Sequence, residues 1–180
     1  EWFKGLLDAE TIQGPGYYGN SPLINGGMVQ FVKNDLQPKF DFLVDDLGMS
    51  EEEARQRFEL LIDVLHEETL LEAPRKGKGD QAEGLHEEAI FVLEDFGCTG
   101  CHTFYGEGLT DGPTLTGYGS REWTIGLIRD PGAAPYFTKE NHMPAFNSKD
   151  DQQMTDDEIA LLVDWMKKRW YEPETEKQAD

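Results

Sequence analysis

The feature that most constrains this 180-residue chain is the placement of its two cysteines. Cys98 and Cys101 stand three positions apart, and His102 follows the second cysteine directly. Both thiols therefore belong to one Cys-x-x-Cys-His motif, and no cysteine remains for a disulfide to a distant part of the chain. A motif of this kind allows three interpretations, which the surrounding sequence separates.

Two of these interpretations need a context that the chain does not supply. A thioredoxin-like redox motif follows a strand and precedes a helix, whereas this motif follows a helical pattern and precedes a glycine-rich loop. A structural zinc site needs about four ligands, and no second Cys-x-x-Cys completes the set. The motif therefore favours covalent attachment of haem c, in which both thiols add to haem vinyl groups and the histidine ligates iron.

The hydrophobic periodicity predicts an all-α fold without convincing strand alternation. Capping boxes open two of the expected helices, one formed by Ser50 and Glu53 and the other by Thr155 and Glu158. The helix expected over residues 85–96 leads straight into Cys98. The expected helices cover residues 50–70, 85–96, 120–129 and 155–170.

The short polar stretch 74–81 contains glycine and the only local cluster of basic residues, which predicts a linker. It divides the chain into a helical module over 1–73 and a second module over 82–172. The last residues, 173–180, have nothing to bury, and we expect them to be a disordered tail.

The two modules share a sequence pattern that indicates an internal repeat. Residues 1–6 align with 122–127 through four identities in six positions, and Tyr17 or Tyr18 then falls opposite Tyr136. Further on, Met28 and Phe31 fall opposite Met143 and Phe146 with the same spacing. The first module is then a degenerate or truncated copy that has no cysteine of its own. Either the chain was cut from a longer two-haem polypeptide, or this copy lost its haem and serves as a docking or scaffold unit.

Charge excludes two classes of partner. The chain carries 16 Lys and Arg against 36 Asp and Glu, a formal net charge of −20. A nucleic-acid binder needs a basic footprint and an anionic membrane attracts basic segments, so neither class of partner fits. The longest apolar runs are five residues, in 89–93 and 159–163, too short to span a bilayer. Any export signal or anchor is expected to lie outside this sequence.

The order of motifs in residues 82–172 resembles that of the class I cytochrome c family. That family has an amphipathic helix, the Cys-x-x-Cys-His motif, a Gly-Pro loop, a middle helix with tryptophan, a loop that delivers methionine, and a C-terminal helix that crosses the first. The chain supplies these parts in order at 85–96, 98–102, 112–117, 120–123, 142–146 and 155–170. The resemblance implies a class I cytochrome c fold over 82–172 that carries one haem c.

The resemblance also implies the ligands of that haem. Cys98 and Cys101 would form the thioether bonds, and His102 would be the proximal iron ligand. Met143 would be the distal ligand, with the adjacent His142 as a weaker competitor. Pro113 would offer its carbonyl to the ring N–H of His102, a contact that orients a metal ligand.

Three further side chains are candidates for hydrogen bonds to the haem propionates. They are Tyr118, Arg121 and Trp123. Histidine–methionine ligation leaves no open position on iron, so the expected function is one-electron transfer rather than bond chemistry. Two alternatives stay open: a peroxidase-type haem enzyme or gas sensor with an open iron site, and a structural or docking subunit of a respiratory complex.

A looser resemblance extends to the cytochrome c portions attached to bacterial quinol-oxidising cytochrome b complexes, through the run from Leu115 to Trp123. It implies membership of a respiratory or photosynthetic electron-transport complex, with a cytochrome b/Rieske-type membrane partner. Because haem c is attached outside the cytoplasmic membrane, the resemblance implies a periplasmic or otherwise extracytoplasmic location. Because the carrier is acidic, its redox partners are expected to present a basic docking face to it.

Overall fold

The computed structural model describes residues 1–137, 142–148 and 152–169, so the predicted disordered tail lies outside the described residues. The all-α fold expected from the sequence is confirmed. The described residues also contain a hairpin of two strands with two residues each. The elements, of which η1 and η2 are single 3-10 turns, run in the order α1 (Trp2–Leu6), α2 (Gly27–Asn34), α3 (Leu36–Asp45), α4 (Glu51–Leu70), η1 (Gly79–Gln81), α5 (Ala89–Asp95), η2 (Cys98–Gly100), β1 (Thr103–Phe104), β2 (Glu107–Gly108), α6 (Arg121–Arg129) and α7 (Asp156–Met166).

Both predicted capping boxes are present and start the two helices where the sequence indicates. In α4 the Ser50 hydroxyl accepts from the backbone N–H of Glu53 at 3.2 Å, and the Glu53 carboxylate accepts from the backbone N–H of Ser50 at 2.7 Å. In α7 the corresponding distances between Thr155 and Glu158 are 3.3 and 2.7 Å. Each box satisfies backbone donors that a helix leaves unpaired at its start.

Two predicted helices are shorter in the structure than the periodicity indicates. The segment before α5 forms turns instead, with Gly84 in the left-handed region at a φ of 69° and the backbone N–H of Ala89 bonded to the carbonyl of His86. At the other end of the domain, α7 stops at Met166 because Lys168 takes a φ of 57°. Hydrophobic spacing continues through turns of this kind, so it overestimates the helical length.

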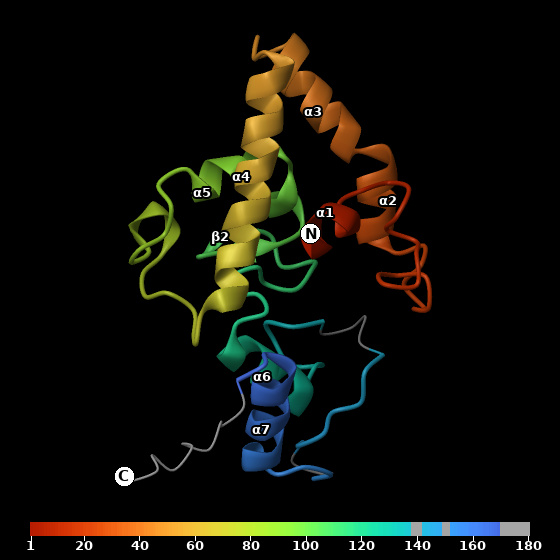
Figure 1. The fold of residues 1–180 in the computed structure, drawn as a ribbon, viewed down its shortest axis with the longest axis vertical. Coiled ribbons are helices and arrows are strands. Elements are labelled where there is room, and N and C mark those ends of the chain that lie inside the picture. The colour runs from red at the N-terminus through yellow and green to blue at the C-terminus, as the bar shows by residue number, and fades with distance from the viewer. Residues whose placement is uncertain (138–141, 149–151, 170–180) are drawn as a thin grey trace, which may run out of the picture.

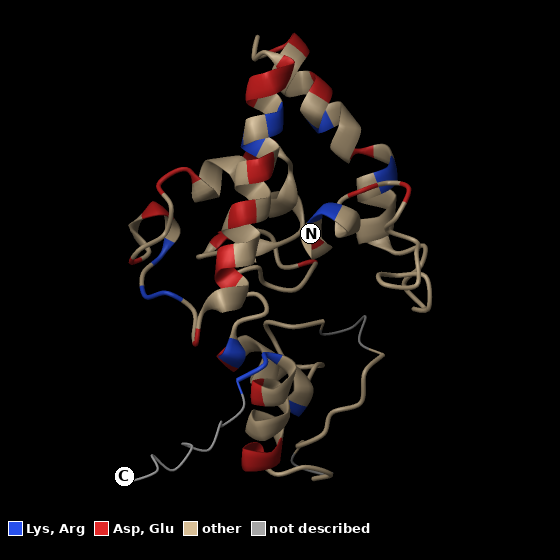
Figure 2. Cartoon of the chain, viewed as in Figure 1, with Lys and Arg blue, Asp and Glu red and all other residues tan. Residues whose placement is uncertain are grey.

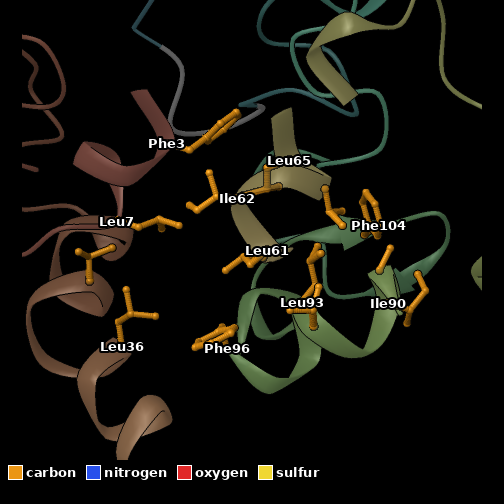
Figure 3. Close-up of a cluster of buried hydrophobic side chains, with 14 of the residues drawn as sticks. Phe3, Leu7, Leu36, Leu61, Ile62, Leu65, Ile90, Leu93, Phe96 and Phe104 are labelled. Atoms are coloured by element: carbon orange, nitrogen blue, oxygen red, sulfur yellow. The ribbon is translucent and has the colours of Figure 1, made fainter. Parts of the chain in front are cut away.

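The main hydrophobic core surrounds α4, the long helix at the centre of Figure 1. Its buried side chains lie between Phe3 and Tyr105 in the sequence. Residues on both sides of the 74–81 segment therefore belong to the same cluster. Figure 3 shows how side chains from α1, α3, α4 and α5 meet in this cluster. The modules 1–73 and 82–172 stay a prediction, but the helices before and after the segment between them bury one common core.

The helix that precedes the cysteine motif packs chiefly on α4. The rings of Phe58 and Phe96 meet edge to face with centroids 5.3 Å apart, and Arg57 forms an ion pair with Asp95. The resemblance predicts instead that the C-terminal helix crosses α5. In the structure α7 packs chiefly on α6, because the apolar face of α5 is already occupied by α4.

A second, smaller core joins α6 and α7 at the lower end of the molecule in Figure 1. Ile128, Ile159 and Val163 are its buried members. Arg121 closes the same helix pair with two hydrogen bonds to the Asp164 carboxylate, at 2.7 and 2.8 Å. Within the described parts of the chain, no helix combines the length and the apolar character that crossing a bilayer requires.

Candidate haem-binding site

The cysteine motif is formed by a tight turn directly after α5. Gly97 ends the helix with a φ of 74°, a left-handed conformation that glycine adopts without steric cost. The chain then enters η2, in which the carbonyl of Cys98 accepts from the backbone N–H of Cys101 at 3.2 Å and of His102 at 3.0 Å. This turn places both thiols and the imidazole on one short segment, as attachment of a single prosthetic group requires.

The two thiols are free and differ in environment. Cys101 is exposed, whereas Cys98 is partly buried and packs against the main core. Burial raises the pKa of the Cys98 thiol to about 12, so this thiol is not a preformed thiolate of the kind that disulfide exchange uses. Across the described ranges, no three His, Cys, Asp or Glu side chains are grouped so that they could hold a metal ion.

His102 is held in one orientation by the loop that follows the hairpin. Its Nδ1–H donates to the carbonyl of Pro113 at 2.7 Å, which is the contact that the resemblance implies. A Cβ on Gly112 would lie 2.6 Å from the ring carbon Cε1, so only glycine allows the loop this close to the imidazole. Burial lowers the pKa of His102, and the Pro113 hydrogen bond opposes that effect. A neutral ring with its proton on Nδ1 offers the Nε2 lone pair to iron.

Trp123 carries the clearest sign of a missing hydrogen-bond partner. Its side chain is 7% exposed, and Nε1 is the one buried side-chain nitrogen or oxygen without a partner among the residues described. A buried donor left unpaired is costly, so this indole N–H fits a site that receives an acceptor from a bound group. Trp123 also lines two open pockets, of about 560 and 410 Å³.

Aromatic neighbours fix the indole from two sides. The ring of Tyr118 lies 4.6 Å and that of Tyr136 5.3 Å from it, measured between centroids. Burial raises the pKa of Tyr118 to about 12, so this hydroxyl stays a neutral donor. Arg121, the third propionate candidate, is bound to Asp164 and so links α6 to α7. The donors Trp123 and Tyr118 therefore fit the acidic edge of a haem better than Arg121 does.

Met143 lies in a part of the structure different from the cysteine turn. It packs against the smaller core and is partly buried, whereas His142 is exposed. The loop that carries it is fastened to the end of α6, where the carbonyl of Ile128 accepts from the backbone N–H of Phe146 at 3.3 Å. Met28, its counterpart in the repeat, packs instead against the main core, as Cys98 does.

Comparison with known proteins assigns a family to one segment of the chain. The family model for cytochrome c matches residues 88–170, which include the cysteine turn, the His102 loop, α6 and α7. This segment is a class I cytochrome c domain. Cytochrome c domains carry covalently bound haem c and transfer electrons. No curated protein and no solved structure matches the chain.

The structure repeats one local arrangement in the cytochrome c domain and in the segment before it. In α6 a Cβ on Gly126 would collide with the Tyr136 hydroxyl, and in α1 a Cβ on Gly5 would collide with the Tyr17 hydroxyl. The same tyrosines contact a tryptophan, with Trp2 and Tyr17 centred 5.7 Å apart. Of the two tyrosines left open by the sequence, Tyr17 is therefore the one that occupies the position of Tyr136.

Sequence reasoning missed one polar group that bears on the cytochrome c domain. Glu68 in α4 is fully buried and bonds to residues of the loop that carries Pro113. The signal was present, because Glu68 follows Leu61 by seven positions and Leu65 by three, which places a carboxylate in the apolar stripe of the helix. Two of its partners, Tyr105 and Gly117, however, lie 37 and 49 positions further along the chain.

Proposed function

We propose that the cytochrome c domain is a one-electron carrier with one haem c, attached through Cys98 and Cys101 and ligated by His102 and Met143. The observation that carries the proposal is the cysteine turn, together with the 2.7 Å hydrogen bond that aligns the His102 ring on Pro113. The family match over 88–170 supports the same chemistry. The domain is thus an electron carrier rather than an enzyme.

When bound, haem c supplies one-electron chemistry, because its iron alternates between the ferrous and ferric states. The residues of the chain do the rest. His102 presents Nε2 while Pro113 holds the opposite nitrogen. Trp123 and Tyr118 supply donors for the haem carboxylates, and for Trp123 a bound acceptor would satisfy an N–H that is otherwise unpaired.

Met143 is proposed as the second ligand on the basis of its position in the sequence. A thioether is neutral and polarizable and favours the ferrous state, so its ligation raises the reduction potential. It also occupies the sixth position, which a peroxidase or gas sensor would leave open. His142 has the weaker claim, since it is exposed.

Carbon monoxide separates the carrier from the open-site alternative. The holoprotein in its reduced form is exposed to carbon monoxide while the visible spectrum is recorded. A six-coordinate carrier binds the gas weakly and slowly, and intact mass gives the chain plus one haem. Fast and tight binding would establish an open iron site of the peroxidase or sensor type, and a colourless protein of unmodified mass would overturn the proposal altogether.

The partners and location of the carrier are proposed from its charge and from the looser resemblance. Figure 2 shows acidic residues along α4 and on other elements, in keeping with the net charge of −20. Such a surface suits a redox partner with a basic face. We place the domain on the periplasmic or extracytoplasmic side, as a unit of a quinol-oxidising cytochrome b complex. Electron transfer with a basic partner should then slow steeply as salt is added.

For residues 1–73 we propose a degenerate cytochrome-c-like module that serves as a scaffold. The support is the repeated tryptophan, glycine and tyrosine arrangement of α1 and α6, and the core that α4 shares with α5. A purely structural subunit would accept no electrons from a quinol-oxidising complex, and rapid reduction of the haem by such a complex excludes that role.

A further inference from the structure

A fully buried carboxylate connects the first part of the chain to the cytochrome c domain. Glu68 lies in the last turn of α4 and is 0% exposed. Arg75 forms an ion pair with it, and the Tyr105 hydroxyl donates to it at 2.9 Å. A buried charge is tolerated only when it is paired and hydrogen-bonded. These bonds therefore hold the Glu68 carboxylate in one position.

The same carboxylate holds the loop that follows the hairpin. The backbone N–H of Gly117 donates to Glu68 Oε2 at 2.6 Å. The next residue back, Thr116, accepts from the backbone N–H of Tyr105 through its hydroxyl, also at 2.6 Å. Because Tyr105 is itself bound to Glu68, the carboxylate fastens both the end of the loop and the segment beside it.

From this anchor the loop runs back to His102 alongside residues 103–105. The carbonyl of Thr103 accepts from the backbone N–H of Leu115 at 2.8 Å and from the Thr114 hydroxyl at 3.1 Å. The next residue back, Pro113, accepts from the His102 ring. Each loop residue from Pro113 to Gly117 therefore takes part in a hydrogen bond, and the backbone of this short loop connects the bond at Glu68 with the bond at the imidazole.

We propose that Glu68 is a positioning residue of the haem site: by holding Gly117 and Tyr105, it keeps the Pro113 carbonyl aligned with the His102 ring. The inference rests on the proposed function, in which His102 ligates the haem iron. A hydrogen bond to the outer nitrogen of a ligating histidine sets its orientation and basicity, and with them the electron density at the metal. The first part of the chain, although it lacks a haem motif, thereby contributes to the potential of the haem.

The test compares Glu68→Leu and Glu68→Gln with Glu67→Gln in the holoprotein. Glu67 is a matched control, since it is the preceding residue of α4 and its carboxylate lies 3.2 Å from the same Arg75, but its side chain is 51% exposed. The midpoint potential and the paramagnetically shifted resonances of the His102 ring are measured together with the thermal midpoint. We expect Glu68→Leu to shift the potential and the ring resonances, Glu68→Gln to shift them less, and Glu67→Gln to leave both unchanged.

A purely structural role gives a different pattern. If the Glu68 variants lower the thermal midpoint but leave the potential and the ring resonances as in the wild type, the inference is wrong. If Glu68→Leu takes up no haem, the Tyr105→Phe variant tests the inference instead, because it removes one donor to the Glu68 carboxylate and keeps the aromatic ring of residue 105. Unchanged His102 resonances in that variant would reject the inference. Failure of the proposed function is visible separately, as a wild-type protein that shows no histidine ligation.

Discussion

At the scale of single residues, the geometry of His102 depends on a neighbour that has no side chain. Gly112 lies so close to the imidazole that a Cβ would come within 2.7 Å of Nδ1, and its backbone N–H donates to the carbonyl of Cys101 at 2.8 Å. The ring thus lies directly against the backbone of the loop that binds it. The proposed iron ligand is therefore already held in one orientation by this loop.

Gly112→Ala should therefore disturb the haem more than the fold. The added methyl group has to displace either the ring or the loop, which breaks the contact between His102 and Pro113. We expect lower haem content and altered optical bands in the haem that remains. Gly16→Ala is the control, because a Cβ at the exposed Gly16 meets nothing within 4 Å and Gly16 lies outside the cysteine motif; equal behaviour of the two variants would contradict the role given to Gly112.

The two methionines of the repeat supply a second comparison at this scale. Replacing Met143 with alanine should remove the sulfur-to-iron absorption band, lower the reduction potential and open the iron to carbon monoxide, because a neutral, soft ligand is lost. Met28→Ala changes the equivalent residue of the first repeat and should leave the spectrum unaltered. The reverse outcome, with only Met28→Ala changing the band, would assign the ligand to the first part of the chain.

At the scale of elements, aromatic contacts at the end of α5 help to hold it against α3 and α4. Phe96 at the end of α5 is fully buried and contacts both Phe58 and Phe40, whose ring centroids lie 5.3 and 6.4 Å away. Phe91 on the same helix is 56% exposed. The helix therefore has one face that packs and one that does not, and the cysteine turn follows the packed end.

Phe96→Ala should lower the free energy of unfolding by about 3–5 kcal/mol, through lost burial and the cavity left beside α4. Phe91→Ala, an identical change on the exposed face, should stay within about 0.5 kcal/mol of the wild type. Denaturant unfolding followed by circular dichroism measures both variants. Similar losses in the two would mean that α5 does not pack on α4 as the structure has it.

The capping box of α7 gives a prediction with a defined pH dependence. Hydrogen bonds from the backbone and hydroxyl of Thr155 lower the pKa of Glu158 in the folded state. The unfolded chain then binds more protons than the folded one, so this stabilisation is present above the ordinary glutamate pKa and is lost as the pH falls through the folded value.

Thr155→Ala should cost about 1 kcal/mol at neutral pH, as the loss of a helix cap does. Its difference from the wild type should shrink on acidification, because the protonated Glu158 no longer accepts the same bonds. Thermal unfolding of both proteins between pH 3 and pH 7 tests this. A difference that stays constant across that range would show that Glu158 takes no part in the cap.

At the scale of the whole molecule, the shared core couples segments that the sequence divides. Leu43 in α3 is fully buried in the cluster that also contains Leu93 and Phe96. Residues of the 74–81 segment bond to both parts of the chain. The backbone N–H of Gly79 donates to the carbonyl of Tyr105 at 2.7 Å, and Arg75 forms an ion pair with Glu68. We therefore expect the first part of the chain to unfold together with the haem-bearing turn.

Leu43→Ala tests this coupling at a distance from the haem. The cavity should cost about 2–5 kcal/mol, and the unfolding transition seen by haem absorbance should fall together with the one seen by circular dichroism. Leu47→Ala, at a site that is 55% exposed, is the control. A haem transition that keeps its midpoint while the helical signal melts earlier would show two independent modules.

The sequence by itself was sufficient for the cysteine motif and for the two capped helix starts, which depend only on neighbouring residues. The Cys98-to-His102 spacing indicated the prosthetic group, and the capping pairs located the starts of α4 and α7. Both signals are local: a helix start and a Cys-x-x-Cys-His turn are defined by backbone bonds three or four residues apart. The family order of motifs then predicted the cytochrome c domain, which the match over 88–170 confirms.

Only the tertiary structure decided which helix packs on which, and which side chains face each other. Packing of α5 on α4, the choice of Tyr17 over Tyr18, and the bonds from Glu68 to Tyr105 and Gly117 all join residues far apart in the chain or distinguish adjacent ones. Periodicity reports that a face is apolar but not what covers it, because many partners bury the same area equally well. The choice among them comes from close packing of the whole core.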